Sequence, residues 1–321
     1  MDQNGGLNNN SNNFSIEKLL QSAIGAHQQG KLQDAEISYR TVLNSQPRNA
    51  VANHNLGIIA TSFNKFESAL PFFKIATEEN PRVKQFWLSY IDALMKENQF
   101  NTAEEILVNK KVIALLGKET YALRVEAQNN LGIKLLETKR FEEAEVSFKK
   151  VIALKSDFYQ AYFNLAITQK SLGKLNEAET NYKKVINLQP NFHIAYTNLG
   201  NVLQALGKLE EAEIAHKKAI SIKADYADAH INLSSTLLEL GKLEEAEISA
   251  KQALLLKHNF KEAYNNLGVI TQKLGKLDEA EINLRKAIEI DPKFEESYKN
   301  LGGVLKSLDR LDEAEDCFKK L

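Results

Sequence analysis

The sequence predicts an all-α solenoid of about nine helix-turn-helix repeats, which amounts to about 18 helices. Three observations support this prediction. Asparagine recurs at 34-residue intervals and is each time followed by leucine, one position of every unit is alanine, and the apolar residues inside a unit follow helical spacing. A single helical hairpin cannot bury both of its faces, so neighbouring units are expected to stack.

The repeat register is defined by the asparagines and the alanines. The regularly spaced asparagines are Asn130, Asn164, Asn198, Asn232, Asn266 and Asn300. The units begin at Ile16, Ala50, Lys84, Val125, Tyr159, His193, Ala227, Lys261 and Glu295, and position 20 of each unit is alanine. Because both regularities share one register, we expect all units to share one architecture.

The unit at residues 193–226 shows why each repeat should be a hairpin. Tyr196, Leu199 and Leu203 recur at steps of three and four, which places them on one face of a first helix. Gly207 follows at position 15, where a residue with positive φ closes a helix, and other units have Gly, Asn, Lys or Asp there. Proline at position 32 of four units ends the second helix, because proline lacks the backbone donor.

The charges support the second helices independently. These segments open with acidic residues and close with basic ones, which complements the helix dipole. They also contain i, i+4 ion pairs, each expected to stabilise its helix by about 0.2 to 0.5 kcal/mol. The pairs are Glu145–Lys149, Glu179–Lys183, Glu213–Lys217, Glu247–Lys251, Glu281–Arg285 and Glu315–Lys319.

The composition argues against two classes of partner. Lys and Arg total 41 against 42 Asp and Glu, so the basic surface of a nucleic-acid binder is missing. No stretch reaches the roughly 18 apolar residues that a membrane span needs, and no secretory leader is visible. The only cysteine, Cys317, excludes an intrachain disulfide. We therefore expect a soluble, cytoplasmic protein.

The sequence contains no recognisable catalytic or metal-binding motif. The six histidines fall at unrelated repeat positions without HExxH spacing, and there is no GxSxG, GxGxxG or phosphate loop. His216 and His230 replace aromatic residues of other units, so packing is their expected role. We predict a protein that is not an enzyme and that binds neither a metal nor a cofactor.

The regularity of the pattern divides the chain. Residues 1–15 are Asn-rich and polar and are expected to be disordered, 16–117 form a divergent array of three units, and 118–321 form a regular array of about six. The third unit has 41 residues, which predicts a long first helix in the fourth unit beginning near Glu119. The last unit is truncated, so apolar side chains there are expected to stay open and to permit self-association or to mark the boundary of a further domain. These side chains are Leu301, Leu305, Phe318 and Leu321.

The 34-residue pattern of aromatic-x-x-Leu-Gly, then Ala, an aromatic residue and Pro resembles the tetratricopeptide repeat over residues 16–321. The resemblance implies a right-handed superhelix whose first helices line a concave groove that binds proteins. The asparagines are at position 6, one of the inner positions in that family. A primary amide can donate to a backbone carbonyl and accept from a backbone N–H at once. With first helices on the order of 10 Å apart, one asparagine could hold an extended peptide about every three residues.

This Asn-Leu-Gly ladder looks like the inner face of the repeat array in protein O-GlcNAc transferases, where matching asparagines bind substrate backbone. By that resemblance, the peptide-binding residues are Asn55, Asn130, Asn164, Asn198, Asn232, Asn266 and Asn300. Gln21 and Ser89 depart from the ladder in the first and third units. The alternative interpretation is structural, with each asparagine bonded to a neighbouring helix.

Two functions fit the sequence. The first is a non-catalytic scaffold that binds extended peptide segments of partner proteins. The second is the substrate-docking region of a protein-modifying enzyme, such as an O-GlcNAc-transferase-like glycosyltransferase or another transferase, whose catalytic domain is outside this chain. The reading frame beyond Leu321 would distinguish them, because only the enzyme requires a further domain.

Overall fold

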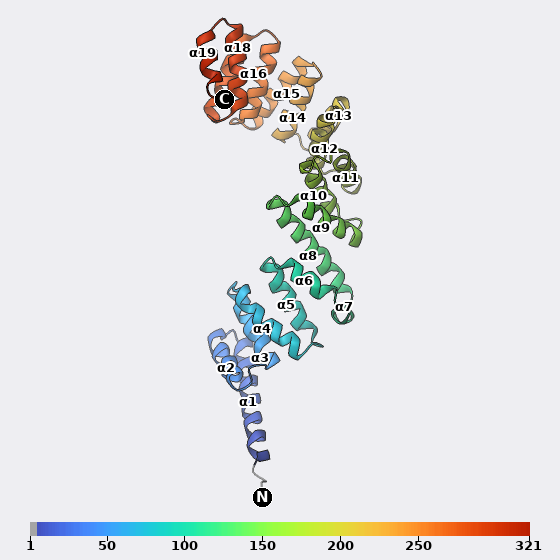
Figure 1. Ribbon diagram of the computed structural model, residues 1–321, viewed down its shortest axis with the longest axis vertical. Coiled ribbons are helices and arrows are strands. Elements are labelled where there is room, and N and C mark those ends of the chain that lie inside the picture. Colours follow the sequence, from blue (N-terminus) through green and yellow to red (C-terminus); the bar gives the residue numbers. More distant parts are fainter. Residues whose placement is uncertain (1–4) are drawn as a thin grey trace. The chain divides into compact units, whose positions relative to one another are not determined.

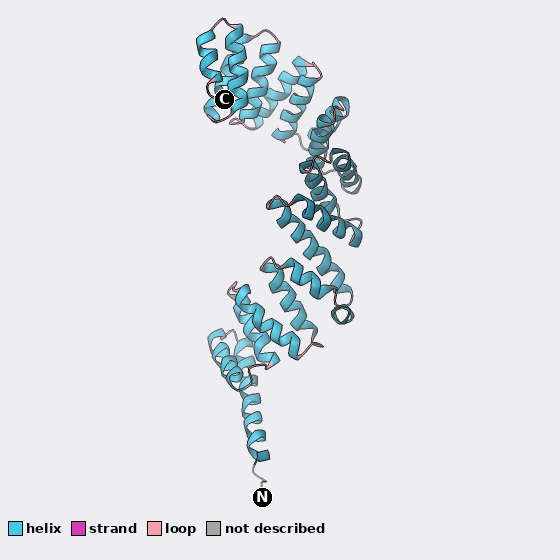
Figure 2. Cartoon of the chain, viewed as in Figure 1, coloured by secondary structure: helices cyan, strands magenta, loops and turns pink. Residues whose placement is uncertain are grey.

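The structure, a computed structural model, describes the backbone of residues 5–321 and the side chains from residue 14 onward. Over this range the chain consists of 19 α-helices joined by short turns, without a strand (Figures 1 and 2). It divides into an N-terminal unit, Met1–Ser156, and a C-terminal unit, Asp157–Leu321. The boundary between these units along the chain therefore follows residue 156, whereas the boundary predicted from the repeat pattern follows residue 117.

In the N-terminal unit, α1 packs on α2, α3 on α4 and α8 on α9. Its helices are α1 (Gly5–Gln28), α2 (Leu32–Ser45), α3 (Ala50–Ser62), α4 (Phe66–Glu79), α5 (Lys84–Lys96), α6 (Phe100–Leu107), α7 (Lys110–Leu116), α8 (Lys118–Glu137) and α9 (Phe141–Leu154). The long helix expected near Glu119 is confirmed as α8, with 20 residues. The third unit also contains the short helix α7, which brings the described part to one helix more than expected.

In the C-terminal unit, α11, α13, α15 and α17 each pack on the even-numbered helices before and after them, and α19 packs on α18. The helices are α10 (Tyr159–Ser171), α11 (Leu175–Leu188), α12 (His193–Ala205), α13 (Leu209–Ile222), α14 (Ala227–Glu239), α15 (Leu243–Leu256), α16 (Lys261–Lys273), α17 (Leu277–Ile290), α18 (Glu295–Ser307) and α19 (Leu311–Phe318). The first helices also contact one another directly, α12 with α14, α14 with α16 and α16 with α18. This stacking of hairpins is the predicted arrangement.

The periodic residues have the packing roles that their spacing indicates. The alanines of position 20 are all buried. Position 15 has positive φ in the described turns whether it is Gly207, Asn64, Lys139 or Asp309. A Cβ added at Gly132 would lie 2.6 Å from the ring of Phe148, so this glycine allows the two helices of its hairpin to pack closely.

Two predictions for the ends of the chain differ from the structure. Residues 1–4 lie outside the described residues, but from Gly5 the segment predicted to be disordered is helical and forms the start of α1. Extending a helix that is already packed on α2 adds backbone bonds without a new nucleation cost. At the other end, Leu301 and Leu305 are buried, because Ala314 and Cys317 of α19 cover them. Only Phe318 and Leu321 of the four predicted open side chains are exposed.

The six predicted i, i+4 ion pairs are all present, and four of those in the C-terminal unit are extended to the next repeat. Glu213 is buried on α13 and accepts hydrogen bonds from Lys217 Nζ at 2.6 Å and from Lys242 Nζ, at the start of the next second helix, at 2.7 Å. The same bridge to the next repeat is formed by Glu179–Lys208, Glu247–Lys276 and Glu281–Arg310. These glutamates therefore connect successive hairpins.

Replacing Glu213 with glutamine is expected to lower the free energy of unfolding by about 1 to 2 kcal/mol at pH 7, since two charge-assisted hydrogen bonds are lost. The bonds from Lys217 and Lys242 hold the pKa of Glu213 below its ordinary value. Its contribution is thus present above the unfolded carboxyl pKa of about 4.3 and is lost as the pH falls through the lower folded value. Urea unfolding of the wild type and the variant, at pH 7 and below pH 4, measures the difference in unfolding free energy at each pH.

A matched control for that substitution is Glu315→Gln. Glu315 is exposed and pairs with Lys319 in its own helix, with no bridge to a later repeat among the described contacts. We expect its effect to stay within about 0.5 kcal/mol. Equal effects of the two substitutions would show that the bridge to the next repeat contributes nothing.

Candidate functional site

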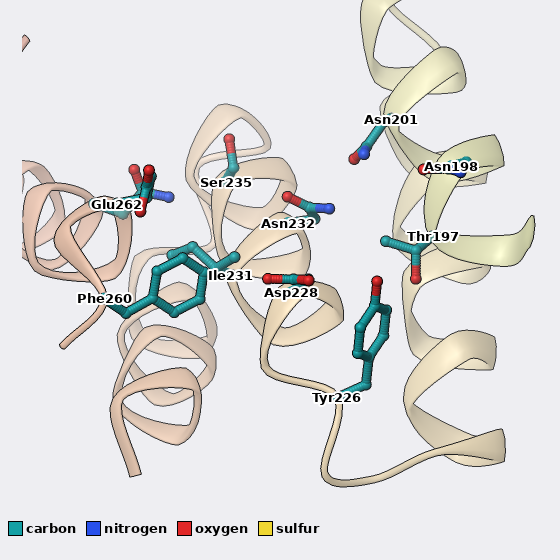
Figure 3. A pocket seen from close by; sticks show the side chains of 11 residues that line it. Thr197, Asn198, Asn201, Tyr226, Asp228, Ile231, Asn232, Ser235, Phe260 and Glu262 are labelled. Carbon is teal, nitrogen blue, oxygen red and sulfur yellow. The ribbon is translucent and has the colours of Figure 1, made fainter. Parts of the chain in front are cut away.

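Three first helices of the C-terminal unit, α12, α14 and α16, line an open groove of about 410 Å³ (Figure 3). Eleven side chains form its walls. They are Thr197, Asn198, Asn201, Tyr226, Asp228, Ile231, Asn232, Ser235, Phe260, Glu262 and Asn266. Three of the seven predicted peptide-binding asparagines are thus brought together on one surface.

The 34-residue period is what brings these amides together. Asn198, Asn232 and Asn266 have the same position in successive first helices, so each points to the same side of the array. All three are half-buried and line the groove. Asn201 and Ser235 follow three residues later on the same helical faces, and they project into the groove beside Asn198 and Asn232 (Figure 3).

The floor of the groove is apolar and its only charged lining residues are acidic. Ile231 and Phe260 are buried below the amides, whereas Asp228 and Glu262 are exposed at the starts of α14 and α16. No basic side chain is among the eleven described lining residues. Burial and the neighbouring Asp228 carboxylate raise the pKa of Tyr226, which therefore remains a neutral hydrogen-bond donor. This surface offers amides, a phenol and carboxylates around an apolar base.

The other predicted asparagines have different surroundings. Asn164 on α10 and Asn300 on α18 also belong to the C-terminal unit, but they do not line the groove. Asn300 donates from Nδ2 to Asn265 Oδ1 at 3.0 Å, and this oxygen also accepts from Ser297 Oγ at 3.0 Å. At that repeat, the amide bonds the neighbouring helix, as the structural interpretation expects. Asn55 and Asn130 are half-buried on α3 and α8 of the N-terminal unit.

Two groups that shape the groove were not identified from the sequence. Gln204 Nε2 donates to Ser235 Oγ at 3.2 Å, and Gln204 Oε1 accepts from Thr236 Oγ1 at 3.1 Å, so the glutamine sets the spacing of α12 and α14. The second group is the aromatic residue that precedes each first helix of the C-terminal unit, represented by Tyr226 and Phe260 in the groove. A periodic signal for it exists at Phe158, Phe192, Tyr226, Phe260 and Phe294.

The two histidines with a predicted packing role and the cysteine are buried. His216 is buried opposite Gly200, and His230 Nε2 lies 2.9 Å from the carbonyl oxygen of Ala224, so both have the predicted packing role. Burial raises the pKa of the Cys317 thiol. Among the described residues, no group of three or more His, Cys, Asp or Glu is arranged to hold a metal ion, and no helix is long and apolar enough to cross a bilayer.

Comparison with known proteins gives matches to repeat families. Models described as TPR repeat and tetratricopeptide repeat match residues 170–207, 192–256 and 262–294. The human protein O-mannosyl-transferase TMTC3 is 28% identical over 134 residues, which are 41% of this chain and 14% of that protein. The chain therefore spans only a small part of the length of this relative.

Solved structures show the same fold. Pseudomonas aeruginosa PilF aligns with a TM-score of 0.54 and 18% identity, over 61% of this chain and 90% of that one. A chain of the APC/C hetero-tetramer Cut9-Hcn1 aligns with a TM-score of 0.56 at 16% identity, over 90% of this chain and 55% of that one. With its 34-residue register, its stacked helical hairpins and these matches, the chain contains tetratricopeptide repeats.

Proposed function

We propose that the groove formed by α12, α14 and α16 holds extended peptide segments of partner proteins, with Asn198, Asn232 and Asn266 bonded to the peptide backbone. Tetratricopeptide repeats indicate a protein-interaction scaffold. The observation that supports the proposal is that three half-buried amides in one repeat register line one open groove.

The chemistry of the amides suits an extended backbone. Each amide can donate to a carbonyl and accept from an N–H without regard to the peptide side chain. First helices packed on the order of 10 Å apart match about three residues of an extended chain, which rises about 3.3 Å per residue. Successive asparagines would therefore bind every third residue, and the side chains between them would set the preference.

A backbone-recognition test follows from this spacing. Peptides selected from a random library on the purified chain are resynthesised with one N-methyl group at each position in turn. We expect affinity to fall with a period of about three residues, because N-methylation removes the backbone donor. A uniform response along the peptide, or failure to select any peptide, would contradict the proposed binding mode.

The acidic lining predicts a preference for basic side chains. Asp228 and Glu262 are exposed in the groove, so a peptide Lys or Arg near them would gain attraction that salt screens. The double substitution Asp228→Asn with Glu262→Gln is expected to weaken binding of a basic peptide by about 3- to 10-fold at low salt, measured by fluorescence anisotropy. Glu210→Gln, on the exposed start of α13, is the control and should leave this affinity unchanged.

The second candidate function is substrate docking for a transferase. The similarity to TMTC3, which is named as an O-mannosyl-transferase, favours this candidate over other enzymes. In that case the same groove would present substrate segments to a catalytic domain outside this chain. The reading frame on both sides of the chain in the gene tests this proposal, since a scaffold alone requires no transferase domain there.

A further inference from the structure

Three isoleucines in one repeat position form an exposed apolar stripe on the second helices of the C-terminal unit. Ile214 on α13, Ile248 on α15 and Ile282 on α17 are 69%, 69% and 67% exposed. Ion pairs bind these helices to one another in sequence, Lys242 to Glu213 and Lys276 to Glu247. None of the three isoleucines lines the peptide groove. An apolar residue that is exposed in the same position of neighbouring helices indicates an interaction surface.

The stripe is widest on α15. Leu255 is also 69% exposed, and it follows Ile248 by seven residues, which places both on one face of the helix. Leu256, next to it, is exposed as well. The equivalent position of Leu255 is polar or small in other units, as at Asn44, Glu78, Ala153, Asn187, Ser221 and Glu289. Helix α15 is therefore the centre of the apolar surface.

Charges flank each isoleucine in a fixed order. On α15, Glu244 precedes Ile248 by four residues and Lys251 follows it by three, and both are exposed on the same face. On α13 the corresponding residues are Glu210 and Lys217, and on α17 they are Asp278 and Arg285. Every isoleucine of the stripe thus has an acid on its amino-terminal side and a base on its carboxyl-terminal side.

We propose that a second copy of this chain covers the stripe in an antiparallel, twofold contact centred on Ile248. The twofold axis of this contact runs along the stripe and therefore crosses α13, α15 and α17. Rotation about this axis places each isoleucine against the same isoleucine of the second copy and reverses the direction of each helix. Because the acid is four residues before Ile248 and the base three residues after it, Glu244 of one chain then faces Lys251 of the other. The same pairing repeats on α13 and α17. A parallel arrangement would instead oppose like charges, so the surface is self-complementary in one orientation.

The oligomeric state of the full chain tests this proposal. Sedimentation velocity over a concentration series should show a reversible dimer. Ile248→Lys places like charges at the centre of the contact and is expected to raise the dimer dissociation constant on the order of 10-fold or more. Ile37→Lys is the matched control, since Ile37 has the same repeat position and is 66% exposed on α2. Its flanking equivalents of Glu244 and Leu255 are Gln33 and Asn44, so dimerisation should be unchanged.

Charge exchange separates a second copy from any other partner. Glu244→Lys and Lys251→Glu should each weaken the dimer, and the double substitution should restore it, because each pair then forms again with reversed sign. Circular dichroism melting verifies that the variants fold. A chain that is monomeric throughout the series, an unaffected Ile248→Lys dimer, or no restoration by the double substitution would overturn the proposal. So would a dimer lost on Leu321→Lys, which would assign the contact to the carboxyl-terminal repeat.

This contact is separate from peptide binding. The stripe is on α13, α15 and α17, whereas the groove is lined from α12, α14 and α16 and their preceding turns. Ile248→Lys is therefore expected to leave the affinity for a selected peptide unchanged, and groove substitutions should leave the dimer intact. Failure of one proposal does not entail failure of the other.

Discussion

Replacing Asn198, Asn232 and Asn266 together with alanine is expected to weaken peptide binding on the order of 100-fold. A typical intramolecular hydrogen bond contributes about 1 kcal/mol net, so three amides bonded to a peptide contribute about 3 kcal/mol. The three side chains line one groove in the same register, and each is half-buried, so truncation removes an ordered amide rather than a mobile one. Isothermal titration with a selected peptide measures the loss.

The single substitutions and a control variant show which asparagines cause the loss of peptide affinity. Each single alanine variant should lose about 3- to 10-fold, and the losses should multiply if the amides bind independent residues of the peptide. Asn283→Ala is the control, because Asn283 is a half-buried amide on α17 that donates to the Glu279 carbonyl oxygen and is outside the groove. Unchanged affinity in the triple variant would remove the asparagines from the mechanism.

Replacing His216 with phenylalanine is expected to stabilise the fold, and increasingly so as the pH falls. His216 is 0% exposed, and neither ring nitrogen has a hydrogen-bond partner among the described residues. Its burial lowers the pKa to about 4. The unfolded chain, with an imidazole pKa of about 6.5, therefore binds the proton more readily below that pH. The histidine adds no pH-dependent cost above about pH 6.5 but costs about 2 kcal/mol at pH 5.

The neighbouring repeats show that phenylalanine fits at this position. Phe73, Phe148 and Phe318 lie opposite Gly57, Gly132 and Gly302, as His216 lies opposite Gly200. We expect His216→Phe to raise the unfolding free energy by about 1 to 3 kcal/mol at pH 7.5, because two unsatisfied buried nitrogens are removed, and by more at pH 5.

Urea unfolding of the wild type and the variant at both pH values measures this difference. His54, whose pKa burial also lowers to about 4, is present in both proteins, so the variant should lose only part of the pH dependence. The reverse change, Phe148→His, should introduce the same dependence in its own repeat. If the difference in unfolding free energy between wild type and variant were the same at pH 7.5 and pH 5, the assignment of the pH dependence to His216 would be wrong.

Local spacing determined most of the fold. The 34-residue register, the buried alanines, the positive-φ turn position and the i, i+4 ion pairs depend on contacts within one hairpin, and helical geometry fixes which residues these join. The long helix α8 follows from the seven additional residues of the third unit for the same reason.

The features that only the tertiary structure determined depend on how one hairpin packs on the next. The bond from Lys242 to Glu213, the Gln204 bridge and the selection of Asn198, Asn232 and Asn266 from seven equivalent asparagines are contacts between repeats. A one-dimensional period shows that residues are equivalent, but not which of them share a surface, because that depends on the rotation between stacked units. For this protein, the sequence by itself therefore determined the repeat and its chemistry. Only the packing of repeats determined that three amides form one groove and that Asn300 bonds its neighbour instead.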